Sequence, residues 1–413
     1  MFAEKTRVLI ASVAAVIITV GIARFAYTPM IPEMMAAGVL DRSLAGLLAT
    51  ANYAGYLSGA LLIAMIRTPA LRIRCYQLGL AGAVLTTALT GCTSNEWLWY
   101  LLRYLAGLSS ACGMLIGAGL LMSWLLTRGH KPELGIFFSG LGLGIVMTAI
   151  LAEWIRTRFS WEQQWFVYAA AALIMLLPVW YWSPDYGRIL PKQAPVNRDR
   201  GSAGNAFMLL LQLAYFCAGV GYVVTATFLV AIAESSPLLT GRGWIIWMVA
   251  GLAATPACWF WDRLVRRQGD WLALLLAYLL NGLSVLLLML SSGLAGILLS
   301  AIIYGASFIG IVSMTLSMVG RLYPDNPSRP MGRLTFSYGI AQMLAPAVVG
   351  YLAEEQGHYT GGLLLTLLLM GAGTLLLQLA RRASVTSEPV PRGAAESGSD
   401  DDEPSRAALR QPG

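Results

Sequence analysis

Twelve long runs of apolar residues constrain the fold of this chain more than any other feature. Each run holds about twenty or more residues, which is the length that an α-helix needs to cross a lipid bilayer. The runs of the first half cover residues 8–29, 43–66, 73–92, 97–126, 134–153 and 162–182. Those of the second half cover residues 206–232, 243–261, 271–290, 293–320, 332–353 and 361–380. The pattern predicts an all-α integral membrane protein with twelve transmembrane helices.

The composition agrees with a membrane protein and argues against several other classes. Of the 413 residues, 57% are hydrophobic and 12% are charged, about half the charge of a soluble domain. The five cysteines form no Cys-x-x-Cys pair and both histidines lie outside the runs, so we expect no metal and no other cofactor. The net charge of +7 comes from short clusters between the runs, which argues against nucleic acid as a partner. No GxSxG, HExxH or paired-aspartate motif lies within a run, so we expect no enzyme.

Lysine and arginine are unevenly distributed along the chain, and basic residues mark the cytoplasmic side of a membrane protein. With the N-terminus in the cytoplasm, 22 of the 28 basic residues fall in cytoplasmic segments. The outer loops then hold only Arg42, Arg156, Arg158 and Arg242. Both termini are therefore predicted to be cytoplasmic. The first run is too long for a signal peptide, so we expect it to be retained as a helix.

The chain divides into two halves that resemble each other. Residues 183–205, rich in Pro, Gly and charge, form the longest connection between runs. Phe138-Ser139 recurs 198 residues later as Phe336-Ser337, Lys131-Pro132 as Arg329-Pro330, and Gly107 as Gly305. We predict two pseudo-symmetric six-helix bundles, 1–182 and 206–382, joined by a cytoplasmic linker at 183–205. The Ser-, Pro-, Gly- and acid-rich residues 383–413 are predicted to be a disordered cytoplasmic tail.

Several motifs resemble the major facilitator superfamily of transporters. Arg103-xxx-Gly107 is similar to its arginine–glycine motif, and Asp262-Arg263 with Arg266-Arg267 is similar to its cytoplasmic loop motif. The segment Gly21–Met34 together with Ala51–Tyr56 resembles the YbfB/YjiJ-like branch, and the likeness covers about residues 8–380. The resemblance implies the major facilitator fold and a monomeric secondary transporter of the inner membrane. Such a carrier moves a small-molecule substrate by alternating access.

The resemblance also implies a cytoplasmic gate. Its residues would be Asp262 and Arg263 in the second half and Arg67 in the first half. The first-half loop, residues 67–74, keeps the arginines of the motif but lacks its acidic residue. The usual ion pair of the first half is therefore in question, and Asp262 is the expected acidic partner.

Arg24 and Arg103 are the only charged residues well inside the runs. An arginine at the bilayer centre costs about 2.5–3.5 kcal/mol on insertion scales, so it usually faces a cavity or a partner. Two guanidinium groups without a mid-depth carboxylate would attract an anion and could bind a carboxylate. The alternative is that each arginine bonds backbone carbonyls or tyrosine oxygens and only orders the bundle. The polar candidates for the rest of the site are Tyr27, Asn52, Tyr56, Tyr215, Tyr222, Tyr304, Tyr338 and Gln342.

Two kinds of carrier and one other function remain open. Exporters of cations tend to place a carboxylate in the cavity, but here Glu33, Glu153 and Glu234 lie near the outer ends of runs. That position favours a carrier of small organic anions over a proton-coupled multidrug or cation efflux pump. A coupling proton would travel on the substrate carboxylate or on Glu33. The third alternative is a membrane sensor that does not transport.

Overall fold

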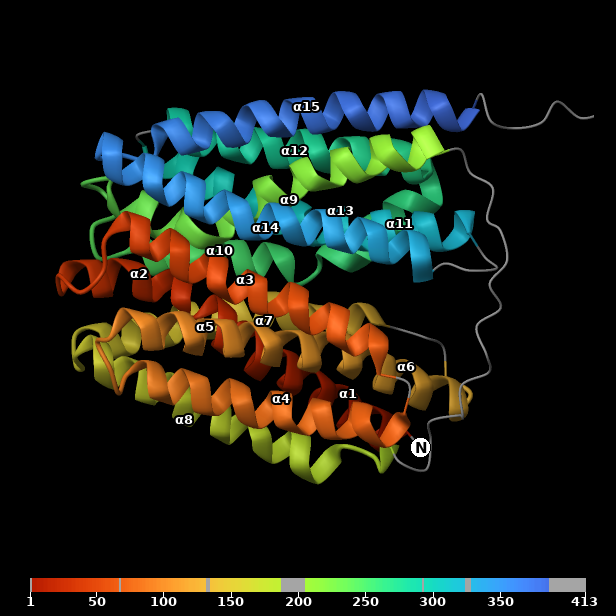
Figure 1. Cartoon of the computed structure of the whole chain (residues 1–413), viewed down its shortest axis with the longest axis horizontal. Helices are drawn as coiled ribbons and strands as arrows, with labels where there is room; N and C mark the ends of the chain where they lie inside the picture. Colours follow the sequence, from red (N-terminus) through yellow and green to blue (C-terminus); the bar gives the residue numbers. More distant parts are fainter. Residues whose placement is uncertain are drawn as a thin grey trace, which may run out of the picture.

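We describe a computed structural model of the chain over residues 2–66, 68–130, 134–186, 205–291, 293–323 and 328–385. Its regular structure in these residues is helical throughout (Figure 1). The helices of the first half are α1 (Phe2–Val16), the π-helix η1 (Ile17–Phe25), α2 (Tyr27–Ala36), α3 (Arg42–Met65), α4 (Pro69–Thr90), α5 (Glu96–Ala111), the π-helix η2 (Cys112–Ile116), α6 (Gly117–Thr127), α7 (Leu134–Arg156) and α8 (Trp161–Trp182). Those of the second half are α9 (Asn205–Glu234), α10 (Gly243–Ala254), α11 (Ala257–Gln268), α12 (Asp270–Leu290), α13 (Leu294–Leu322), α14 (Ser328–Gln356) and α15 (Thr360–Val385).

Ten helices of the described residues are long and apolar enough to cross a membrane. The first runs through α1, η1 and α2, and the pair α10 and α11, bent by 42°, would make an eleventh if it forms one span. Helix α4 is not among them, and it carries Arg72 and Arg74 in its first turns. A multi-pass membrane protein follows from these helices. The count of twelve crossings stays a prediction.

Short polar connections explain where several helices begin. Asp41 accepts a hydrogen bond from the amide of Leu44 (2.6 Å) at the start of α3, and Asn95 accepts one from Leu98 (3.2 Å) at the start of α5. Ser160 and the third residue of α8 form a reciprocal capping box. Such caps satisfy backbone N–H groups that have no partner within the helix. All three lie at one end of the molecule, which the arginine distribution predicts to face outward; we refer to it as the predicted outer face.

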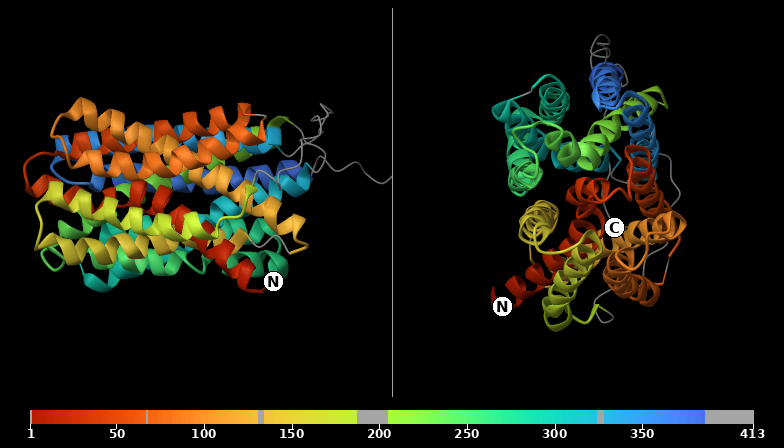
Figure 2. Two further views of the ribbon diagram at one scale, coloured as in Figure 1. Left: turned by 90° about the horizontal axis from the view of Figure 1, so that it is seen from below. Right: turned by 90° about the vertical axis from the view of Figure 1, so that its left-hand side faces the viewer.

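The helices lie in two groups. Helices α1–α8 occupy one side and α9–α15 the other, and an end-on view separates them (Figures 1 and 2). The groups meet where α3 packs on α14, α7 on α10, and α2 on α9. Most of the predicted linker 183–205 and tail 383–413 lies outside the described residues. The domain boundaries therefore stay predictions.

One close helix contact occurs once in each group, at the offset found in the sequence. A Cβ atom added to Gly107 would stand 1.9 Å from the backbone oxygen of Asn52, and one added to Gly305 would stand 2.0 Å from that of Ala250. Gly305 follows Gly107 by 198 residues, and Ala250 follows Asn52 by the same number. The internal repeat thus extends from the sequence to the packing of the helices.

The two groups are joined by hydrogen bonds toward the predicted outer face. The Thr28 hydroxyl donates to the oxygen of Ala226 (2.6 Å), and the Thr50 hydroxyl donates to that of Met343 (2.7 Å). Farther out, the Arg42 amide donates to Glu354 (3.0 Å), and the two side chains approach to 3.9 Å. These contacts hold the helices of the two groups together at the predicted outer face.

Candidate functional site

The Arg24 side chain lies in the middle of the helix packing, on the π-helix η1. It is 6% exposed, and its Cζ atom lies 4.3 Å from the ring centre of Tyr56 and 5.0 Å from that of Tyr53. Both rings belong to α3, so they attract the flat face of the cation and leave its edges uncovered. Among the described residues, Nε and Nη2 of Arg24 have no hydrogen-bond partner. These two atoms form one edge of the guanidinium, the edge that can hold both oxygens of a carboxylate.

Arg103, on α5, is bonded more fully to its neighbours. It is 4% exposed, its Nη1 donates to the oxygen of Ala23 (3.0 Å), and its Cζ lies 4.2 Å from the Tyr27 ring centre. The backbone oxygen of Arg103 in turn accepts a hydrogen bond from Asn52 Nδ2 (3.0 Å). The Tyr27 hydroxyl donates to the oxygen of Ala45. Arg103 therefore connects α5 to the π-helix η1 and to α3, and its buried Nε lacks a partner among the described residues.

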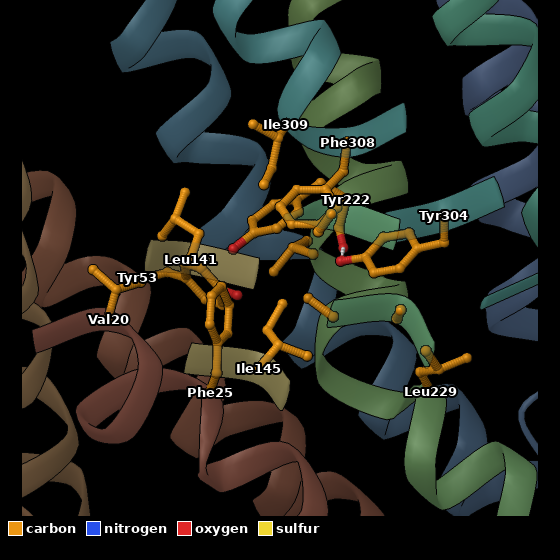
Figure 3. Close-up of a cluster of buried hydrophobic side chains, with 14 of the residues drawn as sticks. Val20, Phe25, Tyr53, Leu141, Ile145, Tyr222, Leu229, Tyr304, Phe308 and Ile309 are labelled. Carbon is orange, nitrogen blue, oxygen red and sulfur yellow. Dashed lines mark hydrogen bonds between the residues drawn. The ribbon is translucent and has the colours of Figure 1, made fainter. Parts of the chain in front are cut away.

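Across from Tyr53 of the first half, the second half presents the aromatic rings of Tyr222, Phe308 and Tyr304 (Figure 3). The ring of Tyr222 stacks on Phe308 at 5.2 Å and on Tyr338 at 6.0 Å, and Tyr338 stacks on Tyr215 at 4.5 Å. Across the boundary, Tyr222 meets the ring of Tyr53 edge-on at 6.4 Å, and its hydroxyl interacts with both Tyr53 and Arg24. The guanidinium of the first half thus faces an aromatic surface of the second half.

The structure brings most of the sequence-predicted site residues together, but in two layers. Arg24, Tyr56 and Tyr222 form the central layer, with Tyr215 and Tyr338 stacked behind Tyr222. Arg103 forms a second layer with Tyr27 and Asn52, both of which it contacts. Tyr304 lies behind the central layer and donates its hydroxyl to the Tyr222 backbone oxygen (3.1 Å). Gln342 is buried on α14.

Two aromatic residues of the central layer were not among the sequence-predicted site residues. Tyr53 covers Arg24 beside Tyr56, and Phe308 stacks between Tyr222 and Tyr304. Helical spacing could have identified both residues, since residues three or four positions apart share one face of a helix. Tyr53 precedes Tyr56 by three residues, and Phe308 follows Tyr304 by four.

Two hollows of the described structure lie away from the central layer. One hollow of about 480 Å³ lies between α12 and α15 beside Trp271 and Leu377. Another of about 440 Å³ lies between α1 and α8 beside Ile10 and Tyr181. Neither hollow is lined by Arg24, whose surroundings belong to the closed interior of the described structure.

Two of the residues expected at the cytoplasmic gate, Asp262 and Arg263, are exposed. Asp262 and Arg263 lie on α11, and Arg263 approaches the ring of Trp259 at 6.0 Å. Within the described part of the chain, Asp262 forms no ion pair. Arg67 lies outside the described residues. No ion pair between the two groups of helices is therefore seen at Asp262 in the described residues.

Acidic residues that the sequence places at the ends of three runs meet at the predicted outer face. Glu33 on α2, Glu153 on α7 and Glu234 on α9 interact electrostatically with one another and with Arg156. We refer to these four residues as the outer charge cluster. Arg156 Nε lies 3.5 Å from Glu153 Oε2, and Glu234 Oε1 accepts a hydrogen bond from the Gly243 amide (3.2 Å).

Comparisons with known proteins agree with the arrangement of the helices. A family profile described as "Uncharacterised MFS-type transporter YbfB" matches residues 16–381. No curated protein matches the sequence. A mutant of the nucleoside transporter NupG superposes with a TM-score of 0.72 at 14% identity, covering 92% of this chain and 99% of that one.

A second solved structure extends the likeness. A bacterial homolog of the human lysosomal transporter Spinster, in an inward-facing and unoccupied conformation, gives a TM-score of 0.62 at 14% identity. The match covers 94% of this chain and 99% of that one. At this level of identity the likeness shows a shared fold.

Proposed function

The chain belongs to the YbfB-type family of major facilitator transporters, and from this premise we propose that it carries a small organic anion across the membrane by alternating access. The proposal places the chain in the inner membrane with both termini in the cytoplasm. Its central observation is the uncovered edge of Arg24. A buried guanidinium whose Nε and Nη2 lack partners is suited to a carboxylate, because both oxygens can be bound at once.

The surroundings of Arg24 support an anion rather than a cation as cargo. The acidic side chains of the outer charge cluster lie at the ends of helices, away from the central layer. The rings of Tyr53 and Tyr56 contact the cation without neutralising its charge. A positive group inside a packed bundle interacts strongly with charge, so a bound cation would be repelled there and an anion attracted.

The roles of the two arginines differ in this proposal. Arg24 binds the carboxylate, and Tyr222 supplies a hydroxyl from the other half of the chain beside it. Arg103, whose Nη1 is already bonded to Ala23, positions η1 and adds positive charge. Binding that uses both halves favours the state in which they meet, and this couples cargo to the conformational change.

The test is a ligand screen on purified full-length protein. The panel contains monocarboxylates, dicarboxylates, sugars, cationic dyes and a nucleoside, the last because a fold neighbour is a nucleoside transporter. We expect a carboxylate to stabilise the protein against thermal unfolding. The same compound should then be transported into or out of proteoliposomes, which separates a carrier from a sensor.

The decisive comparison is carboxylate binding by variants of Arg24. Arg24→Ala should abolish carboxylate binding while the protein still inserts and elutes as a single species. Arg24→Lys keeps the positive charge but cannot bind both carboxylate oxygens side by side, so the affinity for the carboxylate should fall by about tenfold or more. Arg242→Ala, at an exposed site on the predicted outer face, is the matched control for loss of one positive charge. Undiminished binding in Arg24→Ala, or a ligand that proves to be a cation, contradicts the proposal.

A further inference from the structure

The outer charge cluster has more negative than positive groups. Its three carboxylates, Glu33, Glu153 and Glu234, surround one guanidinium, that of Arg156. All four side chains are partly buried. If all four groups were ionised, the cluster would hold two negative charges in excess. Such an excess is costly where burial removes part of the surrounding water.

Both halves of the chain build this cluster. Glu33, Glu153 and Arg156 come from the first half, whereas Glu234 and the Gly243 amide that it accepts from belong to the second. Arg156 also lies against the loop before α10, since a Cβ atom added to Gly241 would stand 2.9 Å from its Nη1. Opening of the outer face would separate these groups and let water in.

The oxygen of a buried side-chain amide beside Glu33 accepts no hydrogen bond. Gln164 on α8 is 2% exposed, and its Nε2 donates to the oxygen of Phe159 (3.1 Å). The Gln164 side chain lies within hydrogen-bonding reach of Glu33, where an N–H of its amide favours the ionised carboxylate, but its Oε1 has no partner in the described part of the structure. An ionised carboxylate can only accept hydrogen bonds, whereas a protonated carboxyl group has one to donate. Protonation of Glu33 would provide a donor for the unpaired oxygen. A buried oxygen without a donor lowers the stability of the protein by about 1–3 kcal/mol.

We propose that the outer charge cluster binds a proton as the outer face closes, with Gln164 Oε1 accepting the hydrogen bond from protonated Glu33. This proposal rests on alternating access in the proposed carrier but does not depend on the chemistry of its cargo. Because the carboxylates interact, the proton belongs to the cluster as a whole. When the outer face opens, water and the separation of the halves release the proton to the outside.

Other titratable groups near the cluster do not take this role. The Tyr168 hydroxyl, on the same helix as Gln164, donates to the oxygen of Thr148 (2.9 Å). Burial raises the pKa of Tyr359 to about 12, with nearby Arg42 acting in the opposite direction, so this phenol stays neutral at physiological pH. Arg158 and Arg242 are exposed. The carboxylates are the groups that change with pH.

The direction of the pH dependence follows from the proton count. Closing takes up a proton, so acid favours the closed outer face and alkali favours the open one. The experiment measures the distance between two spin labels in the full-length protein, without cargo, from about pH 5 to pH 9. One label is on the exposed Cys92 of the first half and the other on His358→Cys of the second. Cys75, Cys112, Cys217 and Cys258 are replaced by alanine in this background.

We expect the population with the shorter distance to grow as the pH falls. Glu33→Gln should hold the outer face closed across the range, because its neutral amide can donate to Gln164. Gln164→Leu should lower the midpoint by about one pH unit, the worth of one such hydrogen bond. Glu96→Gln, an exposed carboxylate at the same face, is the control and should titrate like the parent.

Glu234→Gln is the second variant of the cluster and replaces Glu33→Gln if the latter does not fold. A distance that does not change with pH in the parent protein overturns the proposal. So does unaltered titration in the Glu33 and Glu234 variants. Because no cargo is present, failure of the anion hypothesis would leave these outcomes unchanged. The two proposals therefore fail independently.

Discussion

The two buried arginines, Arg24 and Arg103, differ in how many of their N–H groups already have a hydrogen-bond partner. Arg103 bonds a backbone carbonyl and lies on one tyrosine ring, whereas Arg24 lies on two rings and keeps an edge uncovered. Their sequence environments look alike, since each is a lone arginine in an apolar run. In the proposed function, packing alone distinguishes the arginine that binds the cargo from the one that positions a helix.

This difference predicts unequal losses of affinity. Arg24→Gln should weaken binding of the carboxylate by at least about a hundredfold, since two hydrogen bonds between charged groups are lost. Arg103→Gln should weaken it by about tenfold, because only a more distant positive charge is removed. Titration calorimetry on the purified variants gives both values. Equal losses would assign the carboxylate to both arginines, and thermal unfolding of each variant controls for folding.

The sequence could predict the buried arginines but not their unpaired atoms. Arg24 and Arg103 are visible as charges in apolar runs, and their cost in lipid points to function. Tyr53 and Gln164 carry no such signal, because tyrosine and glutamine are common near the ends and faces of helices. The sequence places Glu33, Glu153 and Glu234 each near the end of a run, but their convergence on Arg156 depends on how three helices pack.

At the scale of helices, glycine sets the distance between α3 and α5. Gly107→Ala would drive a Cβ atom against the Asn52 backbone oxygen, and overpacking of this kind costs about 1–3 kcal/mol. We expect a lower unfolding temperature in a fluorescence-monitored melt. Gly305→Ala should behave alike, because it repeats the contact. Gly119→Ala, where the added Cβ meets open space, is the control and should be neutral or slightly stabilising.

Helix α11 carries the prediction for the cytoplasmic gate. Asp262 is exposed in a structure whose two groups of helices meet at the predicted outer face, so we expect an ion pair with an arginine to form only when the opposite ends approach. Asp262→Asn should therefore slow transport several-fold and leave ligand affinity within about twofold. Initial rates in proteoliposomes, set against equilibrium binding, check this split.

A second acidic residue controls for loss of surface charge. Asp270, eight positions along the chain, pairs with Arg321 on the same half. An exposed pair of this kind is worth about 0–1 kcal/mol. If Asp270→Asn slows turnover as much as Asp262→Asn does, the gate role is refuted.

At the scale of the whole molecule, the arginine asymmetry predicts topology. A reporter enzyme active only outside the cytoplasm, fused after Arg382, should be silent, while a fluorescent protein fused there should be bright. The same pair of reporters in the loop before α10 should give the opposite result. An active external reporter after Arg382 would mean an odd number of crossings.

The sequence predicts the architecture well and its interruptions poorly. Hydrophobic length and the 198-residue repeat predict long helices in two halves, and the family match agrees with this prediction. Periodicity does not show the π-helical turn at Ile17–Phe25 or the 42° bend after Ala254. Such departures depend on neighbouring helices, because an apolar run of either geometry has the same composition.

The repeat has a consequence for symmetry. Thr28 bonds Ala226, which is its own counterpart 198 residues on, and Arg24 meets Tyr222, which is also its own counterpart. Paired counterparts lie where an axis of approximate twofold rotation passes through the molecule. On that axis the copies have diverged, one to a cation and the other to a ring. We expect a bound anion to be oriented accordingly, with its charged group toward the first copy and its carbon skeleton against the second.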